Sequence, residues 1–223
     1  PHKQTQIFIK DYDYALPNER IAHRPLPERD SSKLLVYKSG KMEDDTFYHL
    51  PHYLPPGATL ILNNTRVIEA RLFFTKETGG VIEIFCLDPY QPAAIVQAME
   101  ATEPVQWRCL IGGASKWKPG QILQKPFELN GEALLLQARY ISKEEDSFII
   151  ELSWDGGHSF AEVLHAVGNI PLPPYIKRKA EEGDAARYQT VFAEHNGSVA
   201  APTAALHFTK RVFKDLSEKG ITH

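Results

Sequence analysis

The sequence predicts a mixed α/β chain: a three-layer α/β domain built from two separated segments, with a small β-barrel inserted between them. Two observations carry this prediction. Helix signals accompany isolated strands in both flanks, whereas the middle of the chain contains only short strand-like runs separated by turn pairs. We therefore expect a main domain over residues 1–71 and 156–223, interrupted by a barrel domain over residues 72–155.

The first flank is expected to mix helices, strands and turns. Asp13 should cap a helix over Tyr14–Ala22, with Pro17 in the first turn, where a helix tolerates proline. The run ATLILNN at residues 58–64 predicts a buried strand that ends in polar residues. The remaining signals are a strand over Leu34–Tyr37, an amphipathic stretch around Phe47–Leu54, a strand over Val67–Thr75, and turns at Ser39-Gly40 and Pro55-Pro56-Gly57.

The middle of the chain is predicted to consist of strands alone. The strongest single signal is Asn130-Gly131, which lies between two apolar runs and is typical of a tight hairpin. Further turns are expected at Gly79-Gly80, Gly112-Gly113 and Pro119-Gly120. The predicted strands are FFT (73–75), VIEIFCL (81–87), AAIVQAM (93–99), VQWRCLI (105–111), QILQ (121–124), EALLLQARYI (132–141) and SFIIELSW (147–154).

The second flank returns to helices. The segment NIPLPPYIKR at residues 169–178 should stay extended, because prolines exclude a helix there. The expected helices are one capped by Ser159 and ended by Gly168, one over Ala185–Ala193 capped by Asp184, and one capped by Thr209 and closed by Gly220.

Composition and charge exclude several classes of protein. With 43% hydrophobic and 24% charged residues, the chain is typical of globular proteins rather than disordered or fibrous ones. No apolar run approaches the roughly 18 residues of a membrane span, and the polar N-terminus lacks the apolar centre of a signal peptide. Cys86 and Cys109 form no disulfide framework, so we expect buried thiols in the cytoplasm and no membrane contact.

The distribution of charge favours the flanks as the site of any phosphate contact. Residues 1–73 and 157–223 each carry a net charge of +1, whereas residues 74–156 carry −5. Binding of phosphate needs local Lys and Arg side chains, so the acidic middle is a poor candidate.

Asn63, Asn64, Thr65 and Arg66 form the first polar cluster, directly after a predicted buried strand. In α/β domains, ligands collect at the carboxyl ends of strands, and these side chains suit a ribose, a carboxylate or a phosphate. Asn is also common in ordinary turns, and on local pattern alone a plain turn is the favoured interpretation.

Two further clusters follow the proline-rich segment. Tyr175, Lys177 and Arg178 offer a stacking ring and two cations, although a stiff connector with a solvated basic end explains them equally well. The stretch Arg187-Tyr188-Gln189-Thr190 is predicted to open a helix and to place hydrogen-bonding groups near a base or an amino-acid group. An amphipathic helix that buries Tyr188 is the simpler alternative.

The stretch from Gly197 to Thr209 is the least ordinary part of the sequence. Small residues around Pro202 allow a close approach of backbone to a ligand, and backbone N–H groups before a helix can bind an anion. His207 lies beside the start of that helix and can exchange protons near neutral pH. The alternative is tight packing around a core histidine.

No metal site is expected. His49 and His52 have a ligand-like spacing, but no cysteine or acidic third ligand lies nearby, so a surface pair is the favoured interpretation.

Taken together, several stretches resemble one family closely, the S-adenosylmethionine:tRNA ribosyltransferase-isomerases of queuosine biosynthesis. The matching stretches occur in the family's order and cover both flanks and the entrance to the barrel. They are DYDYALPNERIAHRPLPERDSSKLLVY, PPGATLILNNTRVIEARL, TGGVIEIFCL, GNIPLPPYIKR, RYQTVFA and GSVAAPTAALHFT. The resemblance implies an α/β domain interrupted by a small β-barrel.

The resemblance also implies a reaction. Such enzymes transfer the ribosyl part of S-adenosylmethionine, a co-substrate, to 7-aminomethyl-7-deazaguanine in tRNA. The product is epoxyqueuosine-tRNA, and adenine and methionine are released. The sulfonium makes neighbouring C–H groups acidic, and the attacking amine must lose a proton. No metal or redox cofactor is required, and the implied partners are tRNA and S-adenosylmethionine.

Residue roles follow from the resemblance as hypotheses. His207 and Thr203 are expected at the reacting centre, with His207 transferring protons. Asn63, Asn64, Thr65 and Arg66, with Arg71 nearby, are expected to shape the pocket. The residues expected to contact the nucleoside or tRNA are Tyr175, Arg178, Arg187, Tyr188, Gln189 and Thr190.

Three departures from the family pattern accompany the resemblance. Lys33 stands where the family usually has Arg, Ala205 replaces a usual Gly, and the stretch WRCLIGGASKWKPG is less basic than usual. The family also runs beyond Gly220-Ile221-Thr222-His223, so we expect a truncated form or a fragment. The alternatives are a non-catalytic relative that binds tRNA or nucleotide, and an interaction domain; the oligomeric state stays open.

Overall fold

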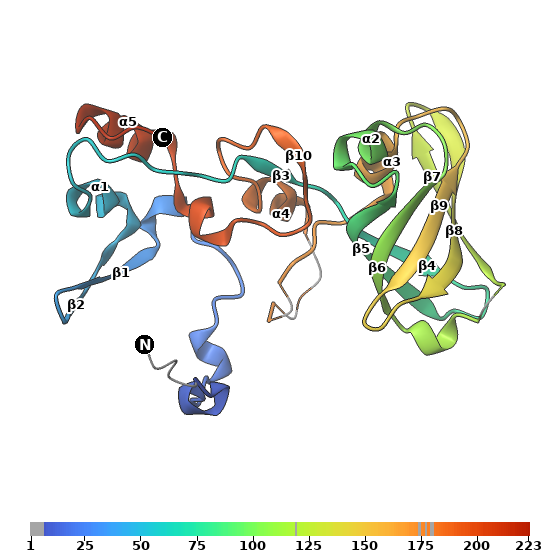
Figure 1. Ribbon diagram of the computed structural model, residues 1–223, viewed down its shortest axis with the longest axis horizontal. Helices are drawn as coiled ribbons and strands as arrows, with labels where there is room; N and C mark the ends of the chain where they lie inside the picture. The colour runs from blue at the N-terminus through green and yellow to red at the C-terminus, as the bar shows by residue number, and fades with distance from the viewer. Residues whose placement is uncertain (1–6, 119, 174, 177, 179–180) are drawn as a thin grey trace, which may run out of the picture.

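The computed structural model describes residues 7–118, 120–173, 175–176, 178 and 181–223 (Figure 1). Figure 1 shows a twisted sheet at one end of the molecule and a group of short elements at the other. The strands are β1 (Lys33–Lys38), β2 (Lys41–Thr46), β3 (Thr65–Val67), β4 (Arg71–Thr75), β5 (Val81–Gln91), β6 (Val105–Gly112), β7 (Ile122–Leu129), β8 (Glu132–Lys143), β9 (Phe148–Trp154) and β10 (His195–Ser198). The α-helices are α1 (Leu50–Tyr53), α2 (Ile95–Glu100), α3 (Phe160–Val167), α4 (Glu182–Arg187) and α5 (Lys210–Glu218).

Six antiparallel strands form the barrel-like sheet, in the order β4-β5-β6-β9-β8-β7. The two outer strands, β4 and β7, also contact each other, so the sheet nearly closes. Apolar side chains alternate along the strands between the inner and the outer face of the sheet, and the inner ones are buried when the sheet curls around them. On β4, Leu72 and Phe74 are fully buried, while Phe73 between them faces outward. The predicted hairpin at Asn130-Gly131 is confirmed, with both residues at positive φ, 53° and 83°.

Helix α3 covers one opening of this sheet. Its Phe160 ring packs 5.5 Å from the ring of Trp107 and 5.4 Å from that of Trp154. The predicted cap at Ser159 is confirmed and forms a complete capping box, because Ser159 and Glu162 satisfy each other's backbone N–H groups.

The predicted strand over residues 93–99 is wrong, because this segment forms helix α2. Ile95, Ala98 and Met99 have the i, i+3, i+4 spacing of one helix face, and Ala98 and Met99 are buried. The apolar run therefore has helical rather than alternating periodicity. The Ala101 carbonyl just after α2 accepts the N–H of Phe160, which links the two helices.

The chain segments that precede and follow the sheet in the sequence form a second, smaller core together. Its buried residues come from distant parts of the sequence: Phe47, Phe208, Val212, Leu216 and Ile221. Two small sheets lie here, the antiparallel hairpin β1–β2 and the parallel pair β3–β10. The predicted cap at Thr209 and the close of α5 at Gly220 are confirmed, since the Thr209 hydroxyl accepts the N–H of Val212 and Gly220 has a φ of 71°.

Three expectations in the first flank are wrong. Residues 14–22 form no α-helix; short 3-10 helices span Ile9–Tyr12 and Asn18–Arg20, and both are exposed. A short helix without a surface to pack against is marginal in water. Residues 58–64 are not a buried strand: Thr59 bridges Thr222, but Ile61 is 96% exposed. The strand expected over 67–75 is split into β3 and β4.

Helix α4 is also displaced from its predicted position. Asp184 is not the cap but the third residue of the helix, and its carboxylate accepts the N–H of Glu181, the true N-cap residue. The helix ends at Arg187, with Tyr188 as its C-cap. The stretch from Arg187 to Thr190 therefore closes a helix instead of opening one.

The mixed α/β class with a barrel-like sheet is confirmed. The domain boundaries at residues 71–72 and 155–156 stay a prediction. Pro119, Pro174, Lys177 and the first six residues, each of which entered a prediction, lie outside the described residues. Within the described ranges, no helix has the length and apolar character needed to cross a membrane.

Candidate active site

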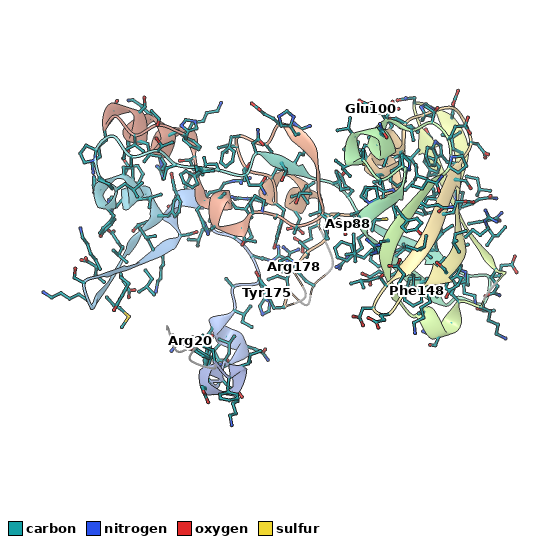
Figure 2. All side chains as sticks on the ribbon, viewed as in Figure 1. Arg20, Asp88, Glu100, Phe148, Tyr175 and Arg178 are labelled. Carbon is teal, nitrogen blue, oxygen red and sulfur yellow. The ribbon has the colours of Figure 1, made fainter. Side chains whose placement is uncertain are left out.

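A pocket of about 480 Å³ lies where four separate segments meet. These are the extended segment before β1, the proline-rich segment at Tyr175, the end of α4, and the 3-10 helix Thr203–His207. Figure 2 shows Tyr175 and Arg178 beside the descending N-terminal segment that carries Arg20. The lining residues are Ala22, His23, Arg24, Pro25, Leu26, Arg29, Ser32, Lys33, Tyr175, Ile176, Arg187, Tyr188, Thr203, Leu206 and His207.

Five of the thirteen residues predicted from the sequence line this pocket. They are Tyr175, Arg187, Tyr188, Thr203 and His207, and they come from three of the four stretches that the sequence singled out. Arg187 donates to the Pro27 carbonyl at 2.7 Å, which fixes the end of α4 against the N-terminal segment. Burial raises the pKa of the Tyr188 phenol above its ordinary value, so this hydroxyl stays protonated at neutral pH.

The cluster Asn63–Arg66 is not part of the lining. The Asn63 carboxamide oxygen accepts the N–H and the hydroxyl of Thr65, at 2.9 and 2.6 Å, which is a side-chain turn of the ordinary kind. Asn64 donates to Glu194 at 3.2 Å, and the side chain of Arg66 is exposed on β3. Arg71 pairs with Glu83 at 3.1 Å over the Phe85 ring, at the barrel surface.

Gln189 does not line the pocket, but it connects the end of α4 to Val67, the residue that follows the cluster Asn63–Arg66. Its carboxamide makes two hydrogen bonds to Val67 of β3: the oxygen accepts the Val67 N–H at 2.9 Å, and the nitrogen donates to the Val67 carbonyl at 2.6 Å. The neighbouring Thr190 is buried, and its hydroxyl has no hydrogen-bond partner among the described residues. Gln189 thus fastens the end of α4 to β3.

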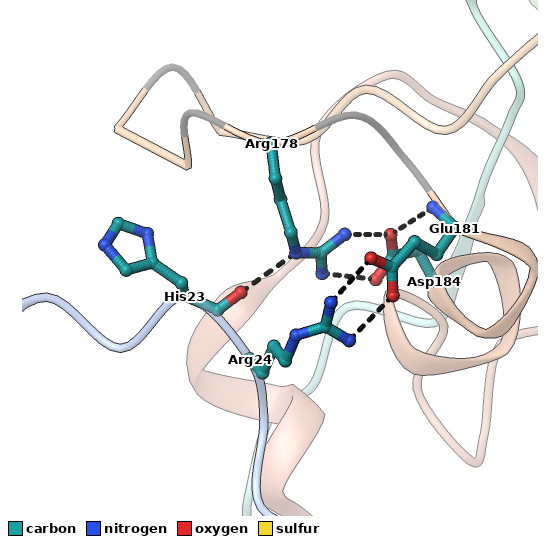
Figure 3. A network of polar contacts seen from close by, with 5 residues as sticks. All are labelled: His23, Arg24, Arg178, Glu181 and Asp184. Carbon is teal, nitrogen blue, oxygen red and sulfur yellow. Dashed lines mark hydrogen bonds and ion pairs between the residues drawn. The ribbon is translucent and has the colours of Figure 1, made fainter.

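Arg178 takes part in a polar network instead of pointing into the pocket (Figure 3). Its guanidinium binds both carboxylate oxygens of Asp184, at 2.6 and 2.7 Å, and donates to the His23 carbonyl at 3.0 Å. Beside it, Arg24 binds both oxygens of Glu181 at 2.8 Å. The hydrogen bond from Arg178 holds the pKa of Asp184 below its usual range. The network joins the N-terminal segment to α4.

Arg29 is one of several lining residues that belong to none of the four polar clusters in the sequence. Its guanidinium donates to three carbonyls, those of Gln189 at 2.6 Å, Ala186 at 2.6 Å and Leu206 at 3.3 Å. Burial, followed by the nearby charge of Arg187, lowers the pKa of Arg29. The one signal in the sequence was its place inside the first family-like stretch, since a single Arg in a loop has no motif of its own.

The backbone of the same Arg29 selects the tautomer of His207. The His207 Nδ1 atom lies 3.2 Å from the Arg29 carbonyl oxygen, which can only accept a hydrogen bond. Nδ1 must therefore carry a proton, and in the neutral ring Nε2 then has the free lone pair. The ring also packs 5.3 Å from Phe47, which restricts its orientation. This arrangement suits a proton acceptor at Nε2.

The charge of the lining is positive. No Asp or Glu belongs to the lining of the pocket. Six basic side chains do, namely His23, Arg24, Arg29, Lys33, Arg187 and His207. Arg24 is neutralised by Glu181. Among the described residues, no group of three or more His, Cys, Asp or Glu side chains is arranged to hold a metal ion. The expectation that no acidic residue lies near the His49 and His52 pair is wrong, because His49 pairs with Asp45 at 2.7 Å while it stacks on His52.

Comparison with known proteins identifies the family. The family model for queuosine biosynthesis proteins matches residues 9–223. A relative named S-adenosylmethionine:tRNA ribosyltransferase-isomerase from Pelobacter propionicus is 41% identical over 96% of this chain and 58% of its own length. One of the same name from Fusobacterium nucleatum is 40% identical over 98% of this chain and 57% of its own.

The solved structure of an S-adenosylmethionine tRNA ribosyltransferase from Thermotoga maritima is 26% identical, with a TM-score of 0.33, over 95% of this chain and 55% of that one. The chain spans less than three fifths of the length of the two curated relatives described. The match to the family model and the identity to both relatives lead to one conclusion. The chain belongs to the queuosine biosynthesis protein family.

Proposed function

We propose that this chain carries the acceptor-side machinery of an S-adenosylmethionine:tRNA ribosyltransferase-isomerase. The reaction would move the ribosyl part of S-adenosylmethionine onto 7-aminomethyl-7-deazaguanine in tRNA, giving epoxyqueuosine and releasing adenine and methionine. One observation carries the proposal beyond the family match. Tyr175, Tyr188 and His207, which lie in three separate family-like stretches, line one pocket.

His207 is the proposed proton acceptor. The Arg29 carbonyl accepts a hydrogen bond from Nδ1–H, so in the neutral ring Nε2 is available to take the proton that the attacking amine loses. Thr203 begins the same 3-10 helix and lines the same pocket, where its hydroxyl can donate to or accept from a substrate group.

The other predicted residues keep graded roles in this proposal. Arg187, Tyr188 and Tyr175 would contact the nucleotide directly. Three predicted residues would support the wall of the pocket without touching the nucleotide. Arg178 binds Asp184, Gln189 binds Val67, and Thr190 is buried. A neighbouring surface, connected to the end of α4 by the hydrogen bond between Val67 and Gln189, would make further substrate contacts. Its residues are Asn63, Asn64, Thr65, Arg66 and Arg71. A cytoplasmic location, tRNA as partner, and no requirement for a metal belong to the same proposal.

The test is release of adenine. The purified chain is incubated with tRNA that carries the 7-aminomethyl-7-deazaguanine precursor and with S-adenosylmethionine labelled in adenine. We expect labelled adenine to appear only when both substrates are present. Binding of both substrates without release would contradict the proposal and indicate a non-catalytic relative.

Substitution of His207 sharpens this test. His207→Ala should lower turnover about a hundredfold or more if the imidazole transfers the proton. The matched control is His165→Ala, since His165 is an exposed histidine on α3 outside the pocket. Near-normal turnover in His207→Ala, or an equal loss in His165→Ala, would remove the proposed role.

A further inference from the structure

Cys86 and Cys109, the two cysteines of the chain, face each other inside the barrel-like sheet. Both are free thiols and fully buried, and their Sγ atoms lie 3.9 Å apart. We propose that this pair is an oxidative modification site, which a peroxide converts into a reversible disulfide between β5 and β6 while the sheet stays folded. Neither residue lines the pocket, so the inference does not depend on the proposed function.

The strand register places the two cysteines directly opposite each other. Strands β5 and β6 lie side by side and antiparallel, and Cys86 is the partner of Cys109 (Figure 1). The Cys86 N–H donates to the carbonyl of Ala70, just before β4, at 2.9 Å. In an antiparallel strand the N–H and C=O of one residue point to the same side, so the backbone groups of Cys86 point toward β4 and away from β6. Cys86 and Cys109 are therefore a non-hydrogen-bonded pair.

A pair of this kind has the spacing that a disulfide needs. Its Cα atoms lie about 4.5 Å apart in a regular sheet, within the range of about 4.4–6.8 Å that disulfides span. A bond of about 2.05 Å requires each sulfur to move by about 1 Å, which rotation of the side chains supplies. A register shift in β5 directly after Cys86 disrupts the ladder locally, so the backbone beside the pair is less constrained.

Hydrogen peroxide supplies the oxidant for this bond. The Cys86 thiolate attacks one oxygen of the peroxide, the O–O bond breaks, and a sulfenic acid and one water are formed. The Cys109 sulfur then attacks the Cys86 sulfur, the S–O bond breaks, and the second water leaves with the proton of Cys109. The two sulfurs lose two electrons, and the peroxide is reduced to two waters. Cys109 donates the hydrogen bond between the sulfurs, which favours Cys86 as the attacking thiolate.

Burial makes the reaction slow but directs its product. Burial, followed by the hydrogen bond to Cys86, raises the pKa of the Cys109 thiol well above its ordinary value, so this thiol stays protonated at neutral pH. A single buried thiol that meets peroxide has no partner for its sulfenic acid. Here a second sulfur lies within reach, as in redox-sensing pairs, and closes the disulfide before further oxidation.

The test is the mass of the chain after exposure to peroxide. The folded chain is treated with hydrogen peroxide at neutral pH, unfolded in urea that contains N-ethylmaleimide, and examined by intact-mass spectrometry. We expect a mass about 2 Da lower, with no maleimide added, because two thiol hydrogens are lost when the disulfide forms. Digestion should give a peptide that joins Cys86 to Cys109 within one chain, and dithiothreitol should restore two reactive thiols.

The controls separate reaction in the folded sheet from reaction in the unfolded chain. Cys86→Ala and Cys109→Ala each keep one thiol, so neither should form the link within one chain. If the pair reacted only after global unfolding, 0.5 M urea would speed the loss of thiols about two- to tenfold, because the unfolded population rises by that factor. We expect an unchanged rate in the wild-type chain.

Four results would overturn the inference. The first is two free thiols that persist long after the same peroxide has oxidised glutathione in a parallel sample. The second is sulfinic or sulfonic acid in place of the link, the third is a link between two chains, and the fourth is acceleration by low urea. The mass and urea measurements use the wild-type chain, so they decide the question even where an alanine variant is unstable.

Discussion

The barrel-like sheet and the region that holds the pocket are built in different ways. In the sheet, most neighbouring strands are also neighbours in sequence, and a core of alternating side chains joins them. The pocket region has a much smaller core and assembles segments that lie about 160 to 180 residues apart, through Arg29 and Asp30. The first region depends on apolar burial and the second on a few polar contacts.

Asp30 shows what these contacts require. Its fully buried carboxylate accepts hydrogen bonds from the hydroxyl of Thr209 at 2.5 Å and from Nε of Arg211 at 2.5 Å, and Arg211 makes a further ion pair to its other oxygen. These bonds attach the N-terminal segment to the start of α5. Because a buried carboxylate is costly to leave unpaired, one substitution here affects two distant segments together.

The largest expected effect tests the sheet. Phe74→Ala removes a fully buried ring from β4 and should lower the free energy of unfolding by about 3–5 kcal/mol. The chain's three tryptophans, Trp107, Trp117 and Trp154, all lie in or beside this sheet, so tryptophan fluorescence during urea unfolding reports on it selectively.

The matched control for this substitution is its neighbour. Phe73→Ala removes the same ring from the outward face of β4, where it is 38% exposed, and should cost much less. Equal losses in the two variants would contradict the division between a buried and an exposed face.

The next effect tests the pocket region. Asp30→Asn keeps the shape of the side chain but removes the charge that Arg211 pairs with, and should destabilise the junction with α5 by about 2 kcal/mol. Hydrogen exchange of the α5 amides should accelerate accordingly, while the tryptophan fluorescence transition stays at the wild-type urea concentration. Asp44→Asn, on exposed β2, is the control, and a shift of the fluorescence transition in Asp30→Asn would break the comparison.

Acid should destabilise the pocket region before it destabilises the sheet. The hydrogen bond from Arg211 lowers the pKa of Asp30, and that from Arg178 lowers the pKa of Asp184. Their stabilising contribution is therefore complete above the unfolded Asp pKa of about 3.9 and is lost as the pH falls through the lower folded values. In the sheet, the pKa of Glu144 is lowered by Arg108 in an exposed pair that solvent screens.

The measurement for this prediction is an acid titration followed by two probes. Protection of the α5 amides should disappear at a higher pH than the change in tryptophan fluorescence. If both probes change together, or the fluorescence changes first, the pocket region does not depend on its carboxylates as described.

The smallest effect compares two helix caps. Ser159→Ala should cost about 1 kcal/mol, as loss of an N-cap commonly does. Thr209→Ala should cost more, because the Thr209 hydroxyl both accepts the N–H of Val212 and donates to the buried carboxylate of Asp30. Urea unfolding followed by circular dichroism measures both variants. A smaller loss for Thr209→Ala would show that the bond to Asp30 contributes nothing.

Local signals predicted some elements well. The hairpin at Asn130-Gly131 and the caps at Ser159 and Thr209 follow from backbone geometry within a few residues, and all three are confirmed. The segments that failed, such as residues 58–64 and 93–99, are apolar runs whose state depends on what packs against them. An apolar run is compatible with a strand or with a buried helix until its neighbours are known.

The candidate site shows the same division. His207 and Tyr188 stood out in sequence and line the pocket, while Asn64 stood out equally and does not. Arg29 had no pattern of its own, because its role consists of bonds to carbonyls of Ala186, Gln189 and Leu206. Backbone carbonyls are present at every residue, so no side-chain motif marks such a position.

By itself the sequence determined the family, the barrel strands with their alternating faces, and the residue types available for chemistry. Alternation, turns and caps are contacts between near neighbours in the chain, and these are written in the order of residues. The tertiary structure decided which polar residues share a pocket and which tautomer His207 adopts. Those properties arise between segments more than 150 residues apart, where only the packing of the whole chain sets the distance.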